Sequence, residues 1–242
     1  MNTYTIKNLS QFKNIKHCFF DRMGGYSTGS FSSLNVGLDR GDDKNALKNR
    51  EKIARNFGVE PINLITLNQV HSTTIHLITR DNISSFQNTQ VPGDGLVTNI
   101  PGVFIGVYTA DCIPLLMYDN NTGYIGAIHC GWRGAFKGML TEALAFMRSI
   151  GCKNLTIASG AFIHKMEFNK NDIPAEYQNF FSSDNVFDFK GFLYNAMQNI
   201  DFEDLNINTF ENDNFFSYRR FTKENLTGRN GVQLSGIMIK NI

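Results

Sequence analysis

The chain has 242 residues, 42% of them hydrophobic, and its 23 Lys and Arg nearly balance 22 Asp and Glu to give a formal charge of +1. Such a chain can bury a large core, but it lacks the basic field that recruits nucleic acid or an anionic membrane surface. Its start has no charged segment followed by an apolar run, and its longest apolar stretch is far below the ~18 residues of a membrane span. We therefore predict a cytoplasmic protein without nucleic-acid or membrane partners.

Glycine, proline and capping signals divide the chain into many short apolar strands and a few helices. The predicted strands cover residues 18–20, 63–67, 74–79, 96–98, 103–109, 114–118, 124–129, 155–159 and 233–239. Asp42 or Asp43 caps a predicted helix that ends near Phe57, before Gly58, and further helices are predicted at 135–150 and twice between 174 and 200. Residues 22–33 read as a loop and 93–95 as a turn. Because strands dominate and no linker interrupts them, we predict one α+β domain over residues 1–242, with mixed β-sheets and flanking helices.

Three polar segments at strand ends carry His71, Cys112 and His129. The separations of 41 and 17 residues do not fit a zinc finger, whose ligands come in close pairs, but they fit a site assembled from separate strands. Two imidazoles and one thiolate suit zinc or copper, and three ligands leave a fourth position open for water or substrate. Each residue also has a structural interpretation, a hydrogen-bonded His or a buried Cys, and spacing does not show that the three converge.

Two further segments suit an anion. Arg22 precedes Gly24 and Gly25, whose backbone N–H groups can approach a phosphate, and Arg219 belongs to an adjacent pair of arginines. On pattern alone, a loop with a glycine pair and surface salt bridges is the favoured explanation of both segments. Asp94, between two glycines, fits a turn.

At these segments the sequence resembles the YfiH-type multicopper polyphenol oxidase (laccase) domain family, whose members are generally described as purine nucleoside phosphorylases. The similarity runs in unchanged order from about residue 18 to the end. The matching segments are RMGGYS at 22–27, LNVG at 34–37, NQVH at 68–71, DGLVT at 94–98, TADCIP at 109–114, HCGWRG at 129–134, FSYRR at 216–220 and TGR at 227–229.

The resemblance implies an α+β fold related in outline to toxin catalytic domains with a Cys–His pair, and one zinc, or copper, on His71, Cys112 and His129. Family members cleave adenosine, inosine, guanosine or methylthioadenosine with phosphate to the base and the (methylthio)ribose 1-phosphate, and they also deaminate adenosine. On this basis we predict a purine nucleoside and phosphate as partners. Asp111 joins the three ligands as a predicted catalytic residue, and we expect Asp111 or Asp94 to orient a ligand imidazole or a ribose hydroxyl. The predicted phosphate- or substrate-binding residues are Arg22, Gly24, Gly25, Asn35, Asp94, Arg133 and Arg219.

The chain departs from the family pattern at residues 159–168, where the usual proline and cysteines are absent, so we expect this segment to differ from the family in base selectivity or in its support of the ligands. Cys130 follows a predicted ligand, and we expect it on the opposite face of its strand. Three alternatives stay open: a copper-dependent polyphenol oxidase, a hydrolase with Cys112 as nucleophile, and a cell-wall accessory protein. The oxidase is disfavoured because a multicopper site needs many His ligands and the chain has only five His residues. The preferred nucleoside and the choice between monomer and homodimer also stay open.

Overall fold

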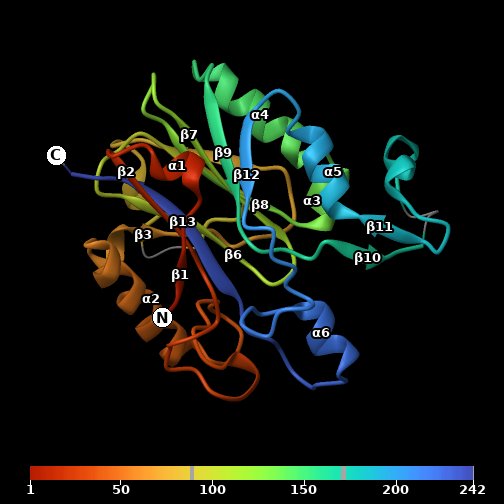
Figure 1. The fold of residues 1–242 in the computed structure, drawn as a ribbon. Coiled ribbons are helices and arrows are strands. Elements are labelled where there is room, and N and C mark those ends of the chain that lie inside the picture. The colour runs from red at the N-terminus through yellow and green to blue at the C-terminus, as the bar shows by residue number, and fades with distance from the viewer. Residues whose placement is uncertain (88–89, 170–172, 242) are drawn as a thin grey trace.

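The computed structural model describes residues 1–87, 90–169 and 173–241, and its strands form two large mixed sheets (Figure 1). The five-stranded sheet has the order β1 (Thr3–Tyr4), β2 (Ile15–Phe20), β13 (Gln233–Ile239), β6 (Phe104–Thr109), β3 (Leu64–Ile65). The six-stranded sheet has the order β12 (Asp201–Asp204), β9 (Leu155–Ser159), β7 (Ile113–Asp119), β8 (Ile125–Cys130), β5 (Gly95–Thr98), β4 (Ile75–Ile78). Each sheet combines parallel and antiparallel pairs, which confirms the predicted α+β class.

Alternating apolar side chains explain why the sheets stack face to face. In β7, Leu116 and Tyr118 belong to the core cluster that also contains Ile105 of the other sheet. Leu115 and Met117, one residue out of phase, belong to a second cluster on the outer face of the six-stranded sheet. Because successive residues of a strand point to opposite faces, the fully apolar run of β7 is buried on both sides.

Helices cover the two outer faces, so that the molecule has four layers (Figure 1). On the five-stranded sheet, α2 (Asp43–Phe57) packs Ile53 and Phe57 against Phe104 and its neighbours. On the six-stranded sheet lie α4 (Met139–Ser149) and α5 (Phe189–Ala196). The shorter elements are α1 (Lys7–Ser10), η1 (Gly29–Phe31), η2 (Pro61–Asn63), η3 (Ile83–Ser85), α3 (Trp132–Phe136), η5 (Ala175–Phe180), α6 (Tyr218–Lys223) and the hairpin of β10 (Lys165–Glu167) and β11 (Val186–Asp188). Within the described ranges, no helix has the length and apolar character needed to cross a membrane.

Several sequence-based element predictions were wrong in detail. The helix predicted at 135–150 is two helices, α3 and α4, because Gly138 between them has a left-handed backbone (φ +88°). The strand predicted at 63–67 is only the two residues of β3. Of the two helices predicted between 174 and 200, the first is the 3₁₀ segment η5, and β11 separates it from α5. Asp42 does occupy the N-cap position before α2, but its carboxylate accepts hydrogen bonds from Asn35 and Asn45 instead of capping the first turn.

Candidate metal centre

His71 lies in the loop between β3 and β4, and side-chain hydrogen bonds attach this loop to the end of β6. The amide of Gln69 donates to the carbonyl of Tyr108 over 2.8 Å and accepts the Tyr108 N–H over 2.9 Å, in the manner of one more strand residue. The Tyr108 hydroxyl donates to the Leu67 carbonyl over 2.8 Å. His71 itself has a φ of +58°, so the backbone turns sharply at the residue that the site uses.

Cys112 and His129 come from neighbouring antiparallel strands of the six-stranded sheet. Cys112 directly precedes β7, and His129 lies near the end of β8 with Pro114 as its partner in the ladder. This register brings the turn before β7 to the end of β8. Asp111, with φ +89°, makes the turn.

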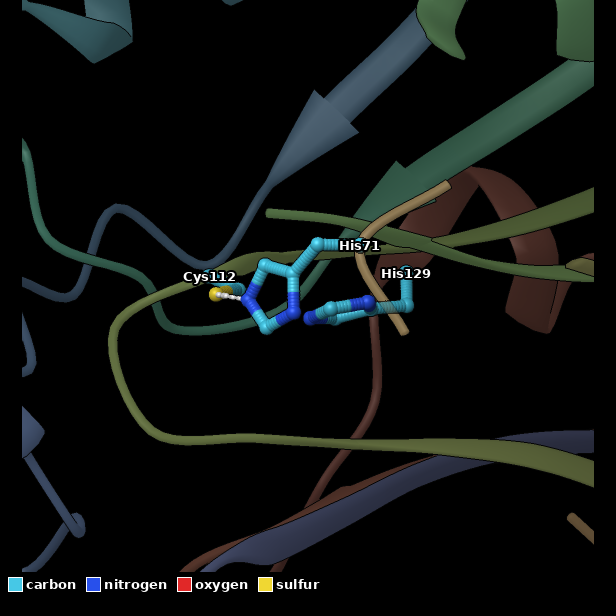
Figure 2. A group of neighbouring side chains, drawn as sticks. All are labelled: His71, Cys112 and His129. Carbon is cyan, nitrogen blue, oxygen red and sulfur yellow. Dashed lines mark hydrogen bonds between the residues drawn. The ribbon is translucent and has the colours of Figure 1, made fainter. Parts of the chain in front are cut away.

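The three side chains converge, as Figure 2 shows. Their donor atoms, one nitrogen of each imidazole and the Cys112 sulfur, all lie within 4.8 Å of one another. Cys112 Sγ is 3.8 Å from Nε2 of His71, and the two imidazole rings meet edge to face with centroids 4.9 Å apart. Among the described residues this is the one group of three or more His, Cys, Asp or Glu so arranged, and it could hold a metal ion.

The Asp94 carboxylate holds His129 and the His71 loop in position. Its fully buried carboxylate lies 2.7 Å from Nδ1 of His129, which leaves Nε2 of that ring for a ligand. The same carboxylate accepts the backbone N–H groups of His71 and Ser72 over 3.0 and 2.6 Å, and the Ser72 hydroxyl over 2.7 Å. One buried acid therefore orients one imidazole and holds the loop that carries the other.

The charges of Cys112, His129 and Asp94 stabilise one another in the metal-free protein. Burial raises the pKa of the Cys112 thiol, but the charge of His129 and hydrogen bonds from both imidazoles outweigh it and lower this pKa to about 6. Burial lowers the pKa of His129, but the Cys112 thiolate and the Asp94 carboxylate outweigh it and raise this pKa to about 9. Although burial raises the pKa of Asp94, hydrogen bonds from His129 and Ser72 hold it well below its ordinary value. The resulting thiolate is the form of cysteine that binds metals.

The residues present fit a soft or borderline transition metal. The donor set is two imidazoles and one thiolate, and a carboxylate bound to the far nitrogen of a ligand His is the usual support of such a site. The shape agrees, since a Cβ at Gly131 would lie 2.3 Å from Cδ2 of His71, so only glycine leaves that ring its place. Cys130, as expected, points away from the site into the core beneath α3 and α4, and burial raises the pKa of its thiol above the ordinary value.

Asp111, a predicted catalytic residue, is bound to chain segments from elsewhere in the fold. Its carboxylate accepts the Thr209 hydroxyl and the backbone N–H of Arg219, each over 2.7 Å. Its carbonyl accepts the Ile163 N–H over 2.9 Å. Of the two acids that the sequence offered for orienting a ligand imidazole, Asp94 takes that place, whereas Asp111 fastens the Cys112 turn to the β9–β10 and α6 segments. Sequence reasoning missed Thr209, which no pattern marks, and Ser72, whose only signal is its position after His71.

Gly24, Gly25 and Asn35, which were predicted to bind an anion, make close contacts within the fold. A Cβ at Gly25 would lie 2.1 Å from the Ser33 carbonyl oxygen, and one at Gly24 would lie 2.2 Å from the Met1 nitrogen. The fully buried amide of Asn35 accepts the N–H groups of Gly37 and Val232 over 3.1 Å each. These contacts show that the fold itself requires the three residues at these positions, and their binding of a ligand stays a prediction.

The predicted arginines differ in how far their guanidinium groups are occupied. Arg22 donates to the Ser32 carbonyl over 2.5 Å and stacks 4.6 Å above the Phe216 ring, and burial lowers its pKa. Arg133, four residues after His129 in sequence, has its guanidinium carbon 4.1 Å from the centroid of the Trp132 ring. The side chain of Arg219 is 40% exposed and pairs with Glu167 at 3.2 Å, whereas Arg133 is the exposed residue of the three and so has the most accessible guanidinium.

The stacked sheets and the three converging donors define a class of protein, an α+β sandwich with one candidate metal site where strands end. The chain belongs to the family described as multi-copper polyphenol oxidoreductase laccase, whose model matches residues 16–240. This confirms the resemblance found in the sequence motifs.

Curated and structural relatives agree with this assignment. A purine nucleoside phosphorylase of Corynebacterium glutamicum is 30% identical to this chain over 230 residues, which cover 89% of this chain and 92% of the relative. Among solved structures, YlmD of Geobacillus stearothermophilus superimposes with a TM-score of 0.80 at 24% identity, over 95% of this chain and 93% of that one. The hypothetical protein YfiH of Bacillus licheniformis gives 0.78 at 24% identity, over 93% of each chain. At that identity the two structures show a shared fold.

Proposed function

We propose that this chain is a zinc-dependent purine nucleoside phosphorylase of the cytoplasm, with copper as the alternative metal. Its substrates are adenosine, inosine, guanosine or methylthioadenosine, and its co-substrate is inorganic phosphate. The observation that carries the proposal is the convergence of His71, Cys112 and His129 donor atoms within 4.8 Å in front of a buried carboxylate. The C. glutamicum relative, named a purine nucleoside phosphorylase and matched over nearly its whole length, supplies the reaction class.

The reaction joins a phosphate oxygen to C1′ of the ribose while the bond from C1′ to N9 of the purine breaks. The bond's electron pair leaves with the base, which must gain a proton, and the sugar leaves as ribose 1-phosphate. When bound, zinc or copper would supply a Lewis acid that stabilises negative charge developing in the site.

The chain's own residues orient the ligand side chains and bind the phosphate. Asp94 keeps the His129 ring in one orientation, and its bonds to His71 and Ser72 keep the facing loop in place. Arg219 and Arg133 are our proposed phosphate ligands, because planar guanidinium groups bind phosphate oxygens in pairs. For Arg22 only the terminal nitrogens are proposed to contact phosphate, because its Nε–H already donates to the Ser32 carbonyl.

A deaminase side activity belongs to the same proposal. Water replaces the 6-amino group of adenosine and ammonia leaves, so inosine accumulates without phosphate being consumed. The Arg133 side chain has no task in that reaction. Substituting Arg133 should therefore weaken phosphorolysis and leave deamination unchanged.

Chromatography of adenosine incubated with zinc-loaded protein, with and without phosphate, tests the proposal. Adenine that forms only with phosphate supports phosphorolysis, and inosine in both reactions supports deamination. Cys112→Ala should abolish both, whereas Cys152→Ala, which removes a buried thiol of another part of the core, should keep both. Absence of both products from zinc- and copper-loaded wild-type protein would refute the proposal.

A second candidate function rests on two of these ligands and on the acid that supports them. Cys112, His129 and Asp94 form a chain of thiolate, imidazole and carboxylate, the arrangement of a cysteine hydrolase. The metal dependence of the activity distinguishes the two functions. Activity that survives a chelator but is lost on alkylation of Cys112 would favour the hydrolase, and activity that disappears with the chelator and returns with zinc would favour the phosphorylase.

A further inference from the structure

A cavity of about 460 Å³ lies between the β10–β11 hairpin and α6. Its volume lies within the range of about 300–1,000 Å³ that is common for small-molecule sites. Four apolar side chains, from segments far apart in sequence, form much of its wall: Ile163, Met166, Val186 and Phe210. A cavity of this size and lining suits a flat, largely apolar ring system.

Hydrogen bonds connect the walls of this cavity directly to the turn that carries Cys112. Asp111, the preceding residue, accepts the backbone N–H of Ile163 over 2.9 Å through its carbonyl and that of Arg219 over 2.7 Å through its carboxylate. Both Ile163 and Arg219 line the cavity. The Thr209 hydroxyl, next to Phe210 in sequence, donates to the same carboxylate over 2.7 Å. The cavity and the metal centre therefore share one rigid turn.

Charged groups stand around the apolar wall. Lys165, Arg219 and Lys223 contribute three cations, and Glu167 contributes one carboxylate, paired with Arg219 at 3.2 Å. Lys223 Nζ lies 5.4 Å from the centroid of the Phe210 ring. A purine needs this combination, since it has two flat faces for an aromatic ring and an edge with both donors and acceptors.

We propose that this cavity is the base pocket of the enzyme, with Phe210 as the surface on which the purine stacks. Lys165 and Glu167 of β10 are then the donor and the acceptor that face the edge of the base. The inference rests on the proposed function, because it assigns a place to the base of that nucleoside. β10 lies within residues 159–168, where the chain departs from the family pattern, so these contacts determine the base selectivity of this chain in particular.

Calorimetric titration of inosine into zinc-loaded protein without phosphate tests the inference, since no turnover then competes with binding. Phe210→Ala should raise the Kd for inosine about tenfold, as expected for loss of one stacking surface. Val186→Trp, which fills the cavity, should raise it further. Phe12→Ala, which removes a partly buried ring packed against Tyr118 in the other core, is the matched control and should leave the Kd unchanged. Zinc content and far-UV circular dichroism of each variant show whether the metal centre and the fold persist.

The outcomes separate this inference from the proposed function. If folded, zinc-loaded Phe210→Ala and Val186→Trp bind inosine as the wild type does, the base lies elsewhere and the inference is overturned, even where the wild type makes ribose 1-phosphate. If wild-type protein shows no binding, the inference is also overturned. If both variants weaken binding but no ribose 1-phosphate forms, the base pocket stands and the proposed reaction fails.

Discussion

The Asp94 carboxylate lies 2.7 Å from Nδ1 of His129 and also accepts the backbone N–H of His71 over 3.0 Å. Two of the three candidate metal ligands, 58 residues apart in sequence, thus depend on one side chain with no exposed surface. A ligand His held in this way is restricted to one ring orientation and one tautomer. The carboxylate therefore places both imidazoles before a metal arrives, which reduces the entropy lost on binding.

The first prediction follows from that relationship. Asp94→Asn should lower zinc affinity about 10- to 100-fold, because the amide loses the charge that supports His129 and turns an NH₂ group toward the donors of the loop. Competition with a chromophoric chelator measures this affinity. Asp81→Asn, at an exposed turn, removes the same charge away from the site and is the control. Equal zinc affinity of Asp94→Asn and wild type would show that the carboxylate does not support the metal.

The second prediction concerns the close approach of backbone and ligand at Gly131. In Gly131→Ala the new Cβ would lie 2.3 Å from Cδ2 of His71, so the ring must move and zinc affinity should fall at least tenfold while the protein stays folded. Gly126→Ala, in β8, the strand that ends just before Gly131, places its Cβ 3.3 Å from Met117 Cβ and should keep wild-type affinity. Zinc content after dialysis, measured beside the melting curve of each variant, checks the difference. Full zinc retention by Gly131→Ala would contradict it.

The motifs around His71, Cys112 and His129 could be found in the sequence, but their convergence could not be derived from it. It depends on the register of β7 against β8 and on Gln69 bonding to the backbone of Tyr108, which are long-range pairings that no local pattern encodes. The sequence offered Asp94 as a turn residue or as a ligand support, and the structure shows both, since it lies just before β5 with its carboxylate on His129.

The fold shows the same division. Strongly apolar runs such as β6, β7 and β8 were predicted to within a few residues, because period and composition mark them clearly. The short edge strands β1 and β12 and the β10–β11 hairpin were missed, since two to four residues are too few to show a period. The break at Gly138 lay inside an otherwise helical pattern, where a single glycine often continues a helix.

The third prediction is a pH dependence of thiol labelling. In metal-free protein the pKa of Cys112 is about 6, below the ordinary thiol value, so the thiolate is present above that pH and is lost as the pH falls through it. Alkylation by iodoacetamide should therefore rise to a plateau with a midpoint near pH 6, against about 8.5 for a free thiol in denaturant. Of the four cysteines, Cys112 alone should react in the folded protein, because the other three are buried. Saturating zinc should suppress the reaction, and peptide mapping identifies the labelled residue. A midpoint at the ordinary thiol value would contradict the thiolate–imidazolium pair.

The fourth prediction is a proton count. His129 has a pKa of about 9 in the metal-free protein, so it carries a proton at pH 7.5 and must release it to bind a metal through its ring nitrogen. Cys112 is already a thiolate at that pH and releases little. Zinc binding at pH 7.5 should therefore release about one proton, and it should release more below pH 6, where Cys112 is also protonated. Calorimetry in buffers of different ionisation enthalpy counts these protons, and no release at pH 7.5 would mean that His129 enters the site neutral.

The last prediction couples metal to stability. A ligand that binds only the folded chain stabilises it by about 2.7 kcal/mol at a hundredfold excess over Kd, which corresponds to a rise in Tm on the order of 5–10 °C for a chain of this size. Zinc should produce such a shift in wild-type protein and in His76→Ala, because His76 lies outside the group of ligands and bonds to the Pro92 carbonyl. It should produce none in Cys112→Ala, where the thiolate is gone. Differential scanning calorimetry with and without a chelator compares the three proteins, and an equal zinc shift in Cys112→Ala would place the metal elsewhere on the chain.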